Sequence, residues 1–165
     1  MLDIPSISAI VAAVGVIVGV VFTVMELRNL VKQRQTDLVV RLYSTFIGKE
    51  CLDATMEFLA LQFEDYNDYV KKYGDPVLSG NPVHKAMLIV DNFFNQVGIL
   101  LHRKLIDVGL VRDVFTYRVE LLWKKAEPII QGFRREHNQP EAGKWFEYLY
   151  NEMKKREQTL QQTQQ

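Results

Sequence analysis

The stretch ISAIVAAVGVIVGVVFTVM, residues 7–25, has the greatest influence on what kind of protein this chain can be. It contains nineteen consecutive residues without a charged side chain. As an α-helix the stretch would be about 28 Å long, which is close to the hydrocarbon thickness of a bilayer. Its length and composition predict a transmembrane helix, and we assign residues 1–26 to a membrane anchor.

Two other interpretations of this stretch fit the residues less well. A cleaved signal peptide has a basic start, a shorter apolar run and a small-residue cleavage site. Here residues 1–5 read Met-Leu-Asp-Ile-Pro, without lysine or arginine. A buried core helix normally has polar residues on one face, whereas this stretch has only Ser8 and Thr23. These differences favour a retained transmembrane helix.

The charges on either side of the stretch predict its orientation. Asp3 is the only charged residue before it, and no cation precedes it. Basic residues follow it closely, namely Arg28, Lys32, Arg34 and Arg41. Because positively charged flanks stay in the cytoplasm, we expect a single-pass protein of the cell membrane with its N-terminus outside and its C-terminal part cytoplasmic.

Small residues form a stripe along the predicted transmembrane helix: Ser8, Ala12, Gly15 and Gly19. The Gly-x-x-x-Gly spacing lets two helix backbones approach closely, which would suit a second copy or a partner helix. Glycine and alanine are also common in transmembrane helices for other reasons. The pattern therefore leaves helix packing and ordinary composition both open.

The rest of the 165-residue chain shows helical spacing of apolar residues and no strand-like alternation. It predicts an all-α fold in which the transmembrane helix continues directly into a cytoplasmic helical bundle, residues 27–157. The final segment, residues 158–165, is rich in glutamine and threonine, and we predict disorder there. The expected helices cover residues 25–47, 49–73, 83–105, 111–125, 128–136 and 141–157.

The sequence lacks the motifs of the common catalytic and cofactor-binding sites. The single cysteine and three histidines offer little material for a metal site. Glycine-rich phosphate loops, zinc-binding motifs and nucleophile elbows are missing from the sequence. We therefore predict no catalytic, cofactor-binding or metal-binding residues, and a protein that is not an enzyme.

Charge separates along the chain although it cancels overall, with 20 basic and 20 acidic residues. Residues 26–49 contain five cations and two anions, whereas residues 50–75 contain seven anions and two cations. The basic segment is expected to lie against anionic lipid. The acidic segment either meets a basic partner or forms a solvated helix face. The other basic clusters are short and interrupted by acids, so no nucleic-acid binding is predicted.

Asp91 and Asn95 lie four residues apart within an otherwise apolar helix. They could line a polar pocket for a small ligand, together with Trp123. The alternative is that they bridge neighbouring helices with their polar atoms satisfied, and that Trp123 is a core residue. We favour the second interpretation and keep the first as an alternative.

Several short motifs occur in order along the chain: Arg34-Gln35-Thr36, Asn92-Phe93-Phe94, Val97-Gly98, Leu105-Ile106-Asp107, Gly109-Leu110-Val111, Trp123, Glu127-Pro128-Ile129 and Trp145-Phe146. Together they resemble a known prokaryotic family, domain of unknown function 4760. The resemblance covers most of residues 27–153 and implies a membrane-tethered helical domain, without established catalytic residues.

These observations lead to one leading functional hypothesis and one alternative. The leading hypothesis is a membrane-anchored, non-catalytic interaction or scaffolding domain, such as an accessory subunit of a membrane complex. Its partners would be the lipid bilayer and a membrane or cytoplasmic protein, or further copies of itself. The alternative is a membrane-tethered sensor that binds a small ligand between its helices.

Overall fold

The first helix, α1, spans Ile4–Phe46 in a computed structural model that describes residues 4–78 and 80–163, with side chains from residue 12 to residue 162. Its length follows from the sequence, because neither glycine nor proline occurs between Met25 and Ile47. Within the apolar stretch, the Thr23 hydroxyl donates a hydrogen bond to the Gly19 carbonyl oxygen at 2.9 Å. The predicted continuity of the apolar helix with the following segment is confirmed.

Contacts between residues divide the chain into two units, which meet between Asp37 and Leu38. In the first unit every residue from 12 to 34 is exposed. The second unit contains the last turns of α1, where Val39, Leu42 and Phe46 are buried. Burial in the described part of α1 therefore begins about eleven residues after residue 26, where the predicted membrane anchor ends. The boundary at residue 26 stays a prediction, because burial against the helical domain does not report where a membrane would end.

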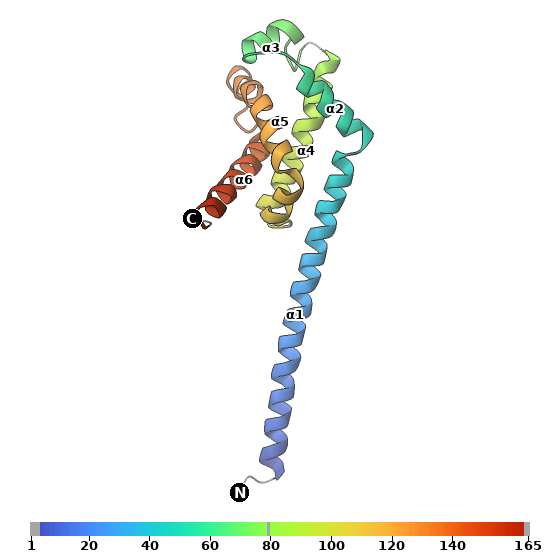
Figure 1. Cartoon of the computed structure of the whole chain (residues 1–165), viewed down its shortest axis with the longest axis vertical. Coiled ribbons are helices and arrows are strands. Elements are labelled where there is room, and N and C mark those ends of the chain that lie inside the picture. Colours follow the sequence, from blue (N-terminus) through green and yellow to red (C-terminus); the bar gives the residue numbers. More distant parts are fainter. Residues whose placement is uncertain (1–3, 79, 164–165) are drawn as a thin grey trace. The chain divides into compact units, whose positions relative to one another are not determined.

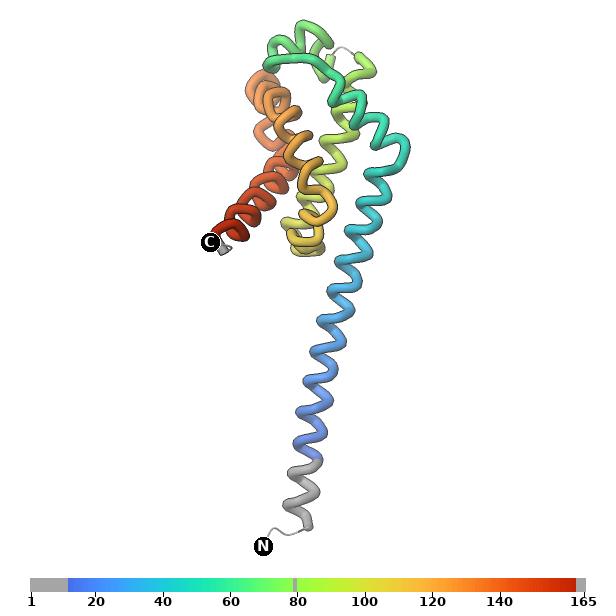
Figure 2. Tube along the Cα trace, viewed as in Figure 1, coloured from blue at the N-terminus to red at the C-terminus, as the bar shows by residue number. Residues whose placement is uncertain are grey.

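The described part of the second unit adds five helices to the end of α1 (Figure 1). Helix α4 contacts α2, α5 and α6, and α5 also contacts α3 and α6. The tube in Figure 2 shows the same succession of helices without strands in the described residues. The prediction of an all-α fold is therefore confirmed. The five helices are α2 (Lys49–Ala60), α3 (Tyr66–Tyr73), α4 (Pro82–His102), α5 (Val108–Glu136) and α6 (Lys144–Thr163).

One predicted helix, residues 49–73, is wrong, because the chain leaves the helix between Ala60 and Tyr66. Asp65 begins α3 by accepting a hydrogen bond from the Asp68 backbone N–H at 2.8 Å. Leu61 ends α2 in an extended conformation. Its carbonyl oxygen accepts a hydrogen bond from the Lys125 ammonium of α5. A side-chain cap and a distant lysine thus stabilise a break that apolar spacing does not reveal.

The prediction of two helices, residues 111–125 and 128–136, is also wrong. The structure has one helix, with Pro128 in its interior. Proline removes one helical N–H and crowds the preceding turn, which usually kinks or ends a helix. Here the buried residues on both sides, including Leu122, Ala126, Ile129 and Ile130, continue a single apolar face. Packing of that face outweighs the local preference.

Helix α6 also differs from its expected limits of residues 141–157. It begins at Lys144 and extends to Thr163, so it includes most of the segment for which we predicted disorder. The residues beyond Glu157 make few buried contacts, because Leu160 is only partly buried and its described neighbours are exposed. The extension is therefore a continuation of the helix rather than an addition to the core.

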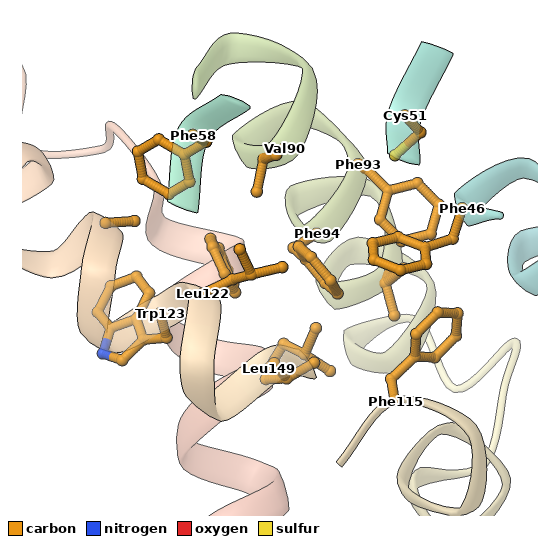
Figure 3. Close-up of a cluster of buried hydrophobic side chains, with 14 of the residues drawn as sticks. Phe46, Cys51, Phe58, Val90, Phe93, Phe94, Phe115, Leu122, Trp123 and Leu149 are labelled. Atoms are coloured by element: carbon orange, nitrogen blue, oxygen red, sulfur yellow. The ribbon is translucent and has the colours of Figure 1, made fainter. Parts of the chain in front are cut away.

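Aromatic side chains from four helices form the centre of the core (Figure 3). Phe46 of α1 lies between Phe93 and Phe94 of α4 and Phe115 of α5, with ring centroids 5.2–5.7 Å away. Phe94 stacks on Phe146 of α6 at 4.8 Å. Such tilted, edge-to-face and offset arrangements are the favourable geometries for aromatic rings. They join the last turns of α1 to the central helices.

Two buried glycines allow backbones to come unusually close within the second unit. A Cβ atom on Gly98 of α4 would lie 2.0 Å from the carbonyl oxygen of Trp145 in α6. A Cβ atom on Gly132 of α5 would lie 2.1 Å from Cγ of Tyr66 in α3. Neither position can accept a larger residue without movement of a neighbouring helix. These contacts fix how closely α4 approaches α6 and α5 approaches α3.

Candidate functional site

A cavity of about 320 Å³ lies within the second unit, between α4, α5 and the two connections that follow α3 and α5. Its lining is almost entirely apolar, and Asp91 is the only charged residue in it. Val77 and Leu88 are 61% and 48% exposed, so the cavity opens to solvent beside them. The lining residues are Pro76, Val77, Met87, Leu88, Asp91, Ala126, Ile129, Ile130, Phe133, Ala142 and Gly143.

Asp91 lines this cavity from the middle of α4. Its Oδ1 atom is buried and has no hydrogen-bond partner among the described residues. Burial raises the pKa of the carboxyl group to about 6, against smaller lowering effects of the Asn95 amide and the Arg134 guanidinium. A buried polar atom without a partner is rare in proteins, because it has lost its hydration without replacement. Asp91 is therefore the least satisfied polar group in the described core.

Asn95, one turn further along α4, has a structural role instead. Its Oδ1 atom accepts hydrogen bonds from the backbone N–H groups of Trp145 and Phe146, each at 3.1 Å. These two residues open α6, and the first N–H groups of a helix have no partner within the helix. The Asn95 side-chain NH₂ donates to the Asp91 carbonyl oxygen at 2.9 Å. Asn95 thus joins α4 to the start of α6 and is not among the cavity-lining residues.

Trp123, the third residue of the predicted polar pocket, is 1% exposed. Its ring lies 5.2 Å from the Phe146 ring and 5.9 Å from the Tyr150 ring, both in α6. It is not one of the residues that line the cavity. The structure therefore places Asp91 at the cavity, Asn95 beside it in the chain, and Trp123 in the aromatic core.

Arg134 of α5 is a cation whose charge acts on Asp91, and the sequence did not point to it. Its Nε atom donates a hydrogen bond to the Ala142 carbonyl oxygen at 2.8 Å, and its Nη1 atom pairs with Glu147 Oε2 at 2.8 Å. The guanidinium therefore binds the connection between α5 and α6 and the start of α6, while Asp91 receives only a Coulomb interaction from it. In the sequence Arg134 belongs to a short basic pair, Arg134-Arg135, and no local pattern indicates this contact.

A second polar cluster joins three elements near the end of α5. His137 Nε2 lies 3.0 Å from Asp75 Oδ2 and 3.2 Å from the Tyr66 hydroxyl oxygen. Because an ionised carboxylate only accepts hydrogen bonds, Nε2 carries a hydrogen atom and donates a hydrogen bond to the Asp75 carboxylate. Burial raises the pKa of Tyr66. Burial also acts to raise the pKa of Asp75, but hydrogen bonds from two backbone N–H groups and from His137 lower it overall. The cluster ties α3 and its following connection to α5.

The predicted membrane residues all lie on α1. Gly15 and Gly19 have open space where a Cβ atom would stand, and Ala12 is exposed. The side chain of Ser8 lies outside the described residues. The predicted juxtamembrane cations, Arg28, Lys32, Arg34 and Arg41, are all exposed. The stripe of small residues is therefore accessible from Ala12 to Gly19.

Helix α1 is long and apolar enough to cross a membrane, by length and composition alone. None of the apolar window within its described part is buried by other parts of the protein. A signal sequence near an N-terminus would meet the same two criteria.

In the described residues no group of three or more His, Cys, Asp or Glu side chains is arranged to hold a metal ion.

These features define an all-α protein with one candidate membrane span and a helical domain that contains an apolar cavity. A family described as domain of unknown function (DUF4760) matches residues 9–153, so the chain belongs to that family. The expected family resemblance is therefore confirmed, and the match includes much of the apolar part of α1. Searches of curated proteins and of solved structures found no match to the chain.

Proposed function

We propose that the protein is a single-pass protein of the cell membrane whose cytoplasmic helical domain binds another protein without catalysing a reaction. In this proposal it serves as a scaffold or as an accessory subunit of a membrane complex. The first twenty-six residues are the anchor, the N-terminus lies outside the cell, and the helical domain lies in the cytoplasm.

The observation that carries this proposal is the exposure of the apolar part of α1. Side chains such as Val16, Ile17 and Phe22 are between 63% and 67% exposed, in a stretch without charges. Exposing so many apolar side chains to water would be strongly unfavourable, at about 25 cal/mol for each Å². A bilayer removes this cost, and the helix needs no backbone partners there because its hydrogen bonds are internal.

The orientation rests on the exposed cations that follow the apolar stretch. Arg28, Lys32 and Arg34 are close enough to the stretch to count in the positive-inside rule. Each cation near an anionic cytoplasmic leaflet contributes about 1 kcal/mol of attraction. The same side chains therefore support both the direction of insertion and contact with lipid headgroups.

Two features of the helical domain support a binding role rather than catalysis. First, several of its buried or partly buried titratable side chains connect helices and connections to one another. The pairs are Tyr69 with His84, Arg134 with Glu147, and His137 with both Asp75 and Tyr66. Second, large apolar side chains remain exposed on the last turns of α1, in the turn that follows it and on α2, namely Val40, Tyr43, Ile47, Leu52 and Met56. Exposed apolar side chains of this kind favour contact with a protein surface.

The topology is tested with single cysteines and an impermeant maleimide in intact cells. Cys51 itself is an unsuitable reporter, because it is buried and burial raises the pKa of its thiol. In a Cys51→Ala background, Leu2→Cys should be labelled in intact cells, and Tyr117→Cys, which is 72% exposed in the native protein, only after permeabilisation. The reverse pattern would show the opposite orientation. A shortened mature chain by intact mass would show a cleaved signal sequence.

The binding role is tested by purification of the full chain from membranes with a mild detergent, followed by mass spectrometry. We expect a second protein in stoichiometric amount or a defined homo-oligomer. Met56→Glu, at a position that is 64% exposed, should reduce that association. Glu57→Lys changes the charge of the neighbouring exposed residue and is the matched control. A monomer without any bound protein, for wild type and variants alike, would contradict the proposal.

A second candidate function, a membrane-tethered sensor of a small ligand, is favoured by one specific observation. The apolar cavity contains a single carboxyl group, that of Asp91, with a buried oxygen that no described residue satisfies. A ligand bound there would contact α4, α5 and the α5–α6 connection. The class of ligand can be inferred from the lining.

A further inference from the structure

We propose that the cavity beside Asp91 binds a small organic cation, in which a protonated amine is attached to an apolar body and the Asp91 carboxylate is its counter-ion. This inference rests on the second candidate function above, and it specifies the chemistry of the ligand. The size of the cavity, its lining, its charge and its polar partners all bear on this ligand class.

The size and lining of the cavity suit an apolar body of modest size. About 320 Å³ is at the lower end of the range for sites that bind small molecules, which are mostly apolar with a few polar groups. Met87, Leu88, Ile129 and Phe133 provide aliphatic and aromatic contact surface from two helices. The partly open side is bordered by Val77, whose exposed side chain a bound hydrocarbon group would cover.

The charge of the cavity favours a cation over an anion or a neutral molecule. Asp91 is the only charged residue in the described lining, and the nearby Arg134 is already engaged by Glu147 and by the Ala142 carbonyl oxygen. No described lining residue is a cation that could bind an anionic ligand. The Asn95 amide acts on the Asp91 carboxyl group, but the buried Oδ1 atom has no hydrogen-bond partner among the described residues. Such an atom is unfavourable in a carboxylate, and a cation that pairs with the carboxylate reduces that penalty. The raised pKa of Asp91 reflects the same penalty.

Water is the competing occupant, and the lining argues against it as the main one. A buried water molecule usually makes about three hydrogen bonds to polar groups that otherwise lack partners. Asp91 is the single polar side chain among the described lining residues, so water beside it would find few further side-chain partners there. An ammonium group that donates to Asp91, with its apolar body against the other walls, matches the composition of the cavity better.

The experiment uses three probes that share a cyclohexane ring and differ in charge: cyclohexylamine, cyclohexanol and cyclohexanecarboxylate. Binding to the full chain in lipid nanodiscs is measured by titration calorimetry at pH 7.5, with empty nanodiscs as the blank. The amine should bind about tenfold more tightly than the alcohol, because hydrogen bonds to charged groups are stronger than neutral ones. The carboxylate should not bind measurably.

Three variants separate the role of charge from that of shape. Asp91→Asn keeps the size of the side chain and should weaken binding of the amine about tenfold while leaving the alcohol within about twofold. Leu88→Trp, at an exposed lining position, should weaken both probes by occupying space at the opening. Asp113→Asn removes an exposed carboxylate of α5 outside the lining and should change neither.

The outcomes distinguish the ligand class from the sensor function. Equal binding of amine and alcohol, or an amine affinity that Asp91→Asn leaves unchanged, would overturn the proposed cation. The sensor function would survive that result if Leu88→Trp still weakened binding of the alcohol. Absence of binding for all three probes would show a cavity occupied by water only, and both the proposed cation and the sensor function would then be rejected.

Discussion

The apolar part of α1 and helix α4 are both rich in apolar residues, but they are covered in different ways. Every residue of α1 from 12 to 34 is exposed. Helix α4 buries eight of its residues, and these include Val90, Phe94 and Val97. The described protein therefore provides a solvent-excluding environment for α4 and none for the first part of α1.

Polar residues of α4 and of the apolar stretch of α1 find their hydrogen-bond partners in different places. Helix α4 contains His84, Asp91 and Asn95, and two of these make hydrogen bonds to other helices: His84 with Tyr69, and Asn95 with the start of α6. In the apolar stretch of α1, Thr23 instead bonds to its own helix. His84 and Asn95 thus specify tertiary contacts, whereas Thr23 is satisfied within its own helix, an arrangement that a bilayer would require.

The largest expected effect compares the same truncation in both regions. Phe94→Ala should lower the free energy of unfolding of the helical domain by about 3–5 kcal/mol, because it leaves a cavity among four rings. Phe22→Ala, at a position that is 67% exposed, should change it by less than about 0.5 kcal/mol. Tryptophan fluorescence during denaturation measures both, since both tryptophans lie in the helical domain. Equal effects would show that the apolar stretch of α1, like its last turns, contributes to the core.

Glycine substitutions compare the same two regions by adding side-chain atoms instead of removing them. Gly98→Ala places a Cβ atom 2.0 Å from the Trp145 carbonyl oxygen, so α4 and α6 must separate at a cost of about 3 kcal/mol. Gly19→Ala meets open space and should leave unfolding of the domain unchanged. Gly15→Leu combined with Gly19→Leu should weaken helix association in crosslinking experiments if the stripe is an interface. A stable Gly98→Ala variant would disprove the close approach.

Asp91→Asn tests a carboxyl group of α4 whose Oδ1 atom lacks a hydrogen-bond partner among the described residues. The folded-state pKa is about 6 and the ordinary value is 3.8, so the folded state binds the proton more tightly. Stability contributed by this group is therefore highest below pH 4 and falls as the pH rises through 6. Well above pH 6 the variant should be about 3 kcal/mol more stable than the wild type, because each unit of pKa difference is worth about 1.4 kcal/mol, and this gain should disappear below pH 4. Asp113→Asn is the control, and a pH-independent difference would refute the assignment.

The smallest effect concerns the hydrogen bonds that Asn95 makes to the start of α6. Asn95→Ala removes the acceptor for two backbone N–H groups and should cost about 1–2 kcal/mol, as for other helix caps. Hydrogen exchange at the Trp145 and Phe146 amides should accelerate more than exchange elsewhere in α6. Thr23→Val removes a hydrogen bond within α1 and should leave these amides unaffected. Uniform acceleration throughout α6 would indicate general destabilisation instead of a lost cap.

The candidate site could be predicted only in part. Asp91 and Asn95 attract attention in the sequence because they interrupt an apolar helix. The residues that complete the cavity come from Pro76 to Gly143, and no local pattern connects positions so far apart in the chain. Trp123 was grouped with them by its chemistry, but the rotation of α5 directs its ring to Phe146 and Tyr150.

The sequence alone establishes the all-α class, the apolar candidate span and the continuation of that span as a helix. These depend on local periodicity and on charge-free length, which are properties of the chain alone. Packing of the helices is needed to explain why residues 61–65 leave the helix, why Pro128 lies inside one, and why Asp91 borders a cavity. Each of these depends on contacts between residues far apart in the chain: Lys125 with Leu61, the buried face around Ile129, and the walls of the cavity, which come from α4, α5 and two connections. Such contacts exist only after the helices have packed.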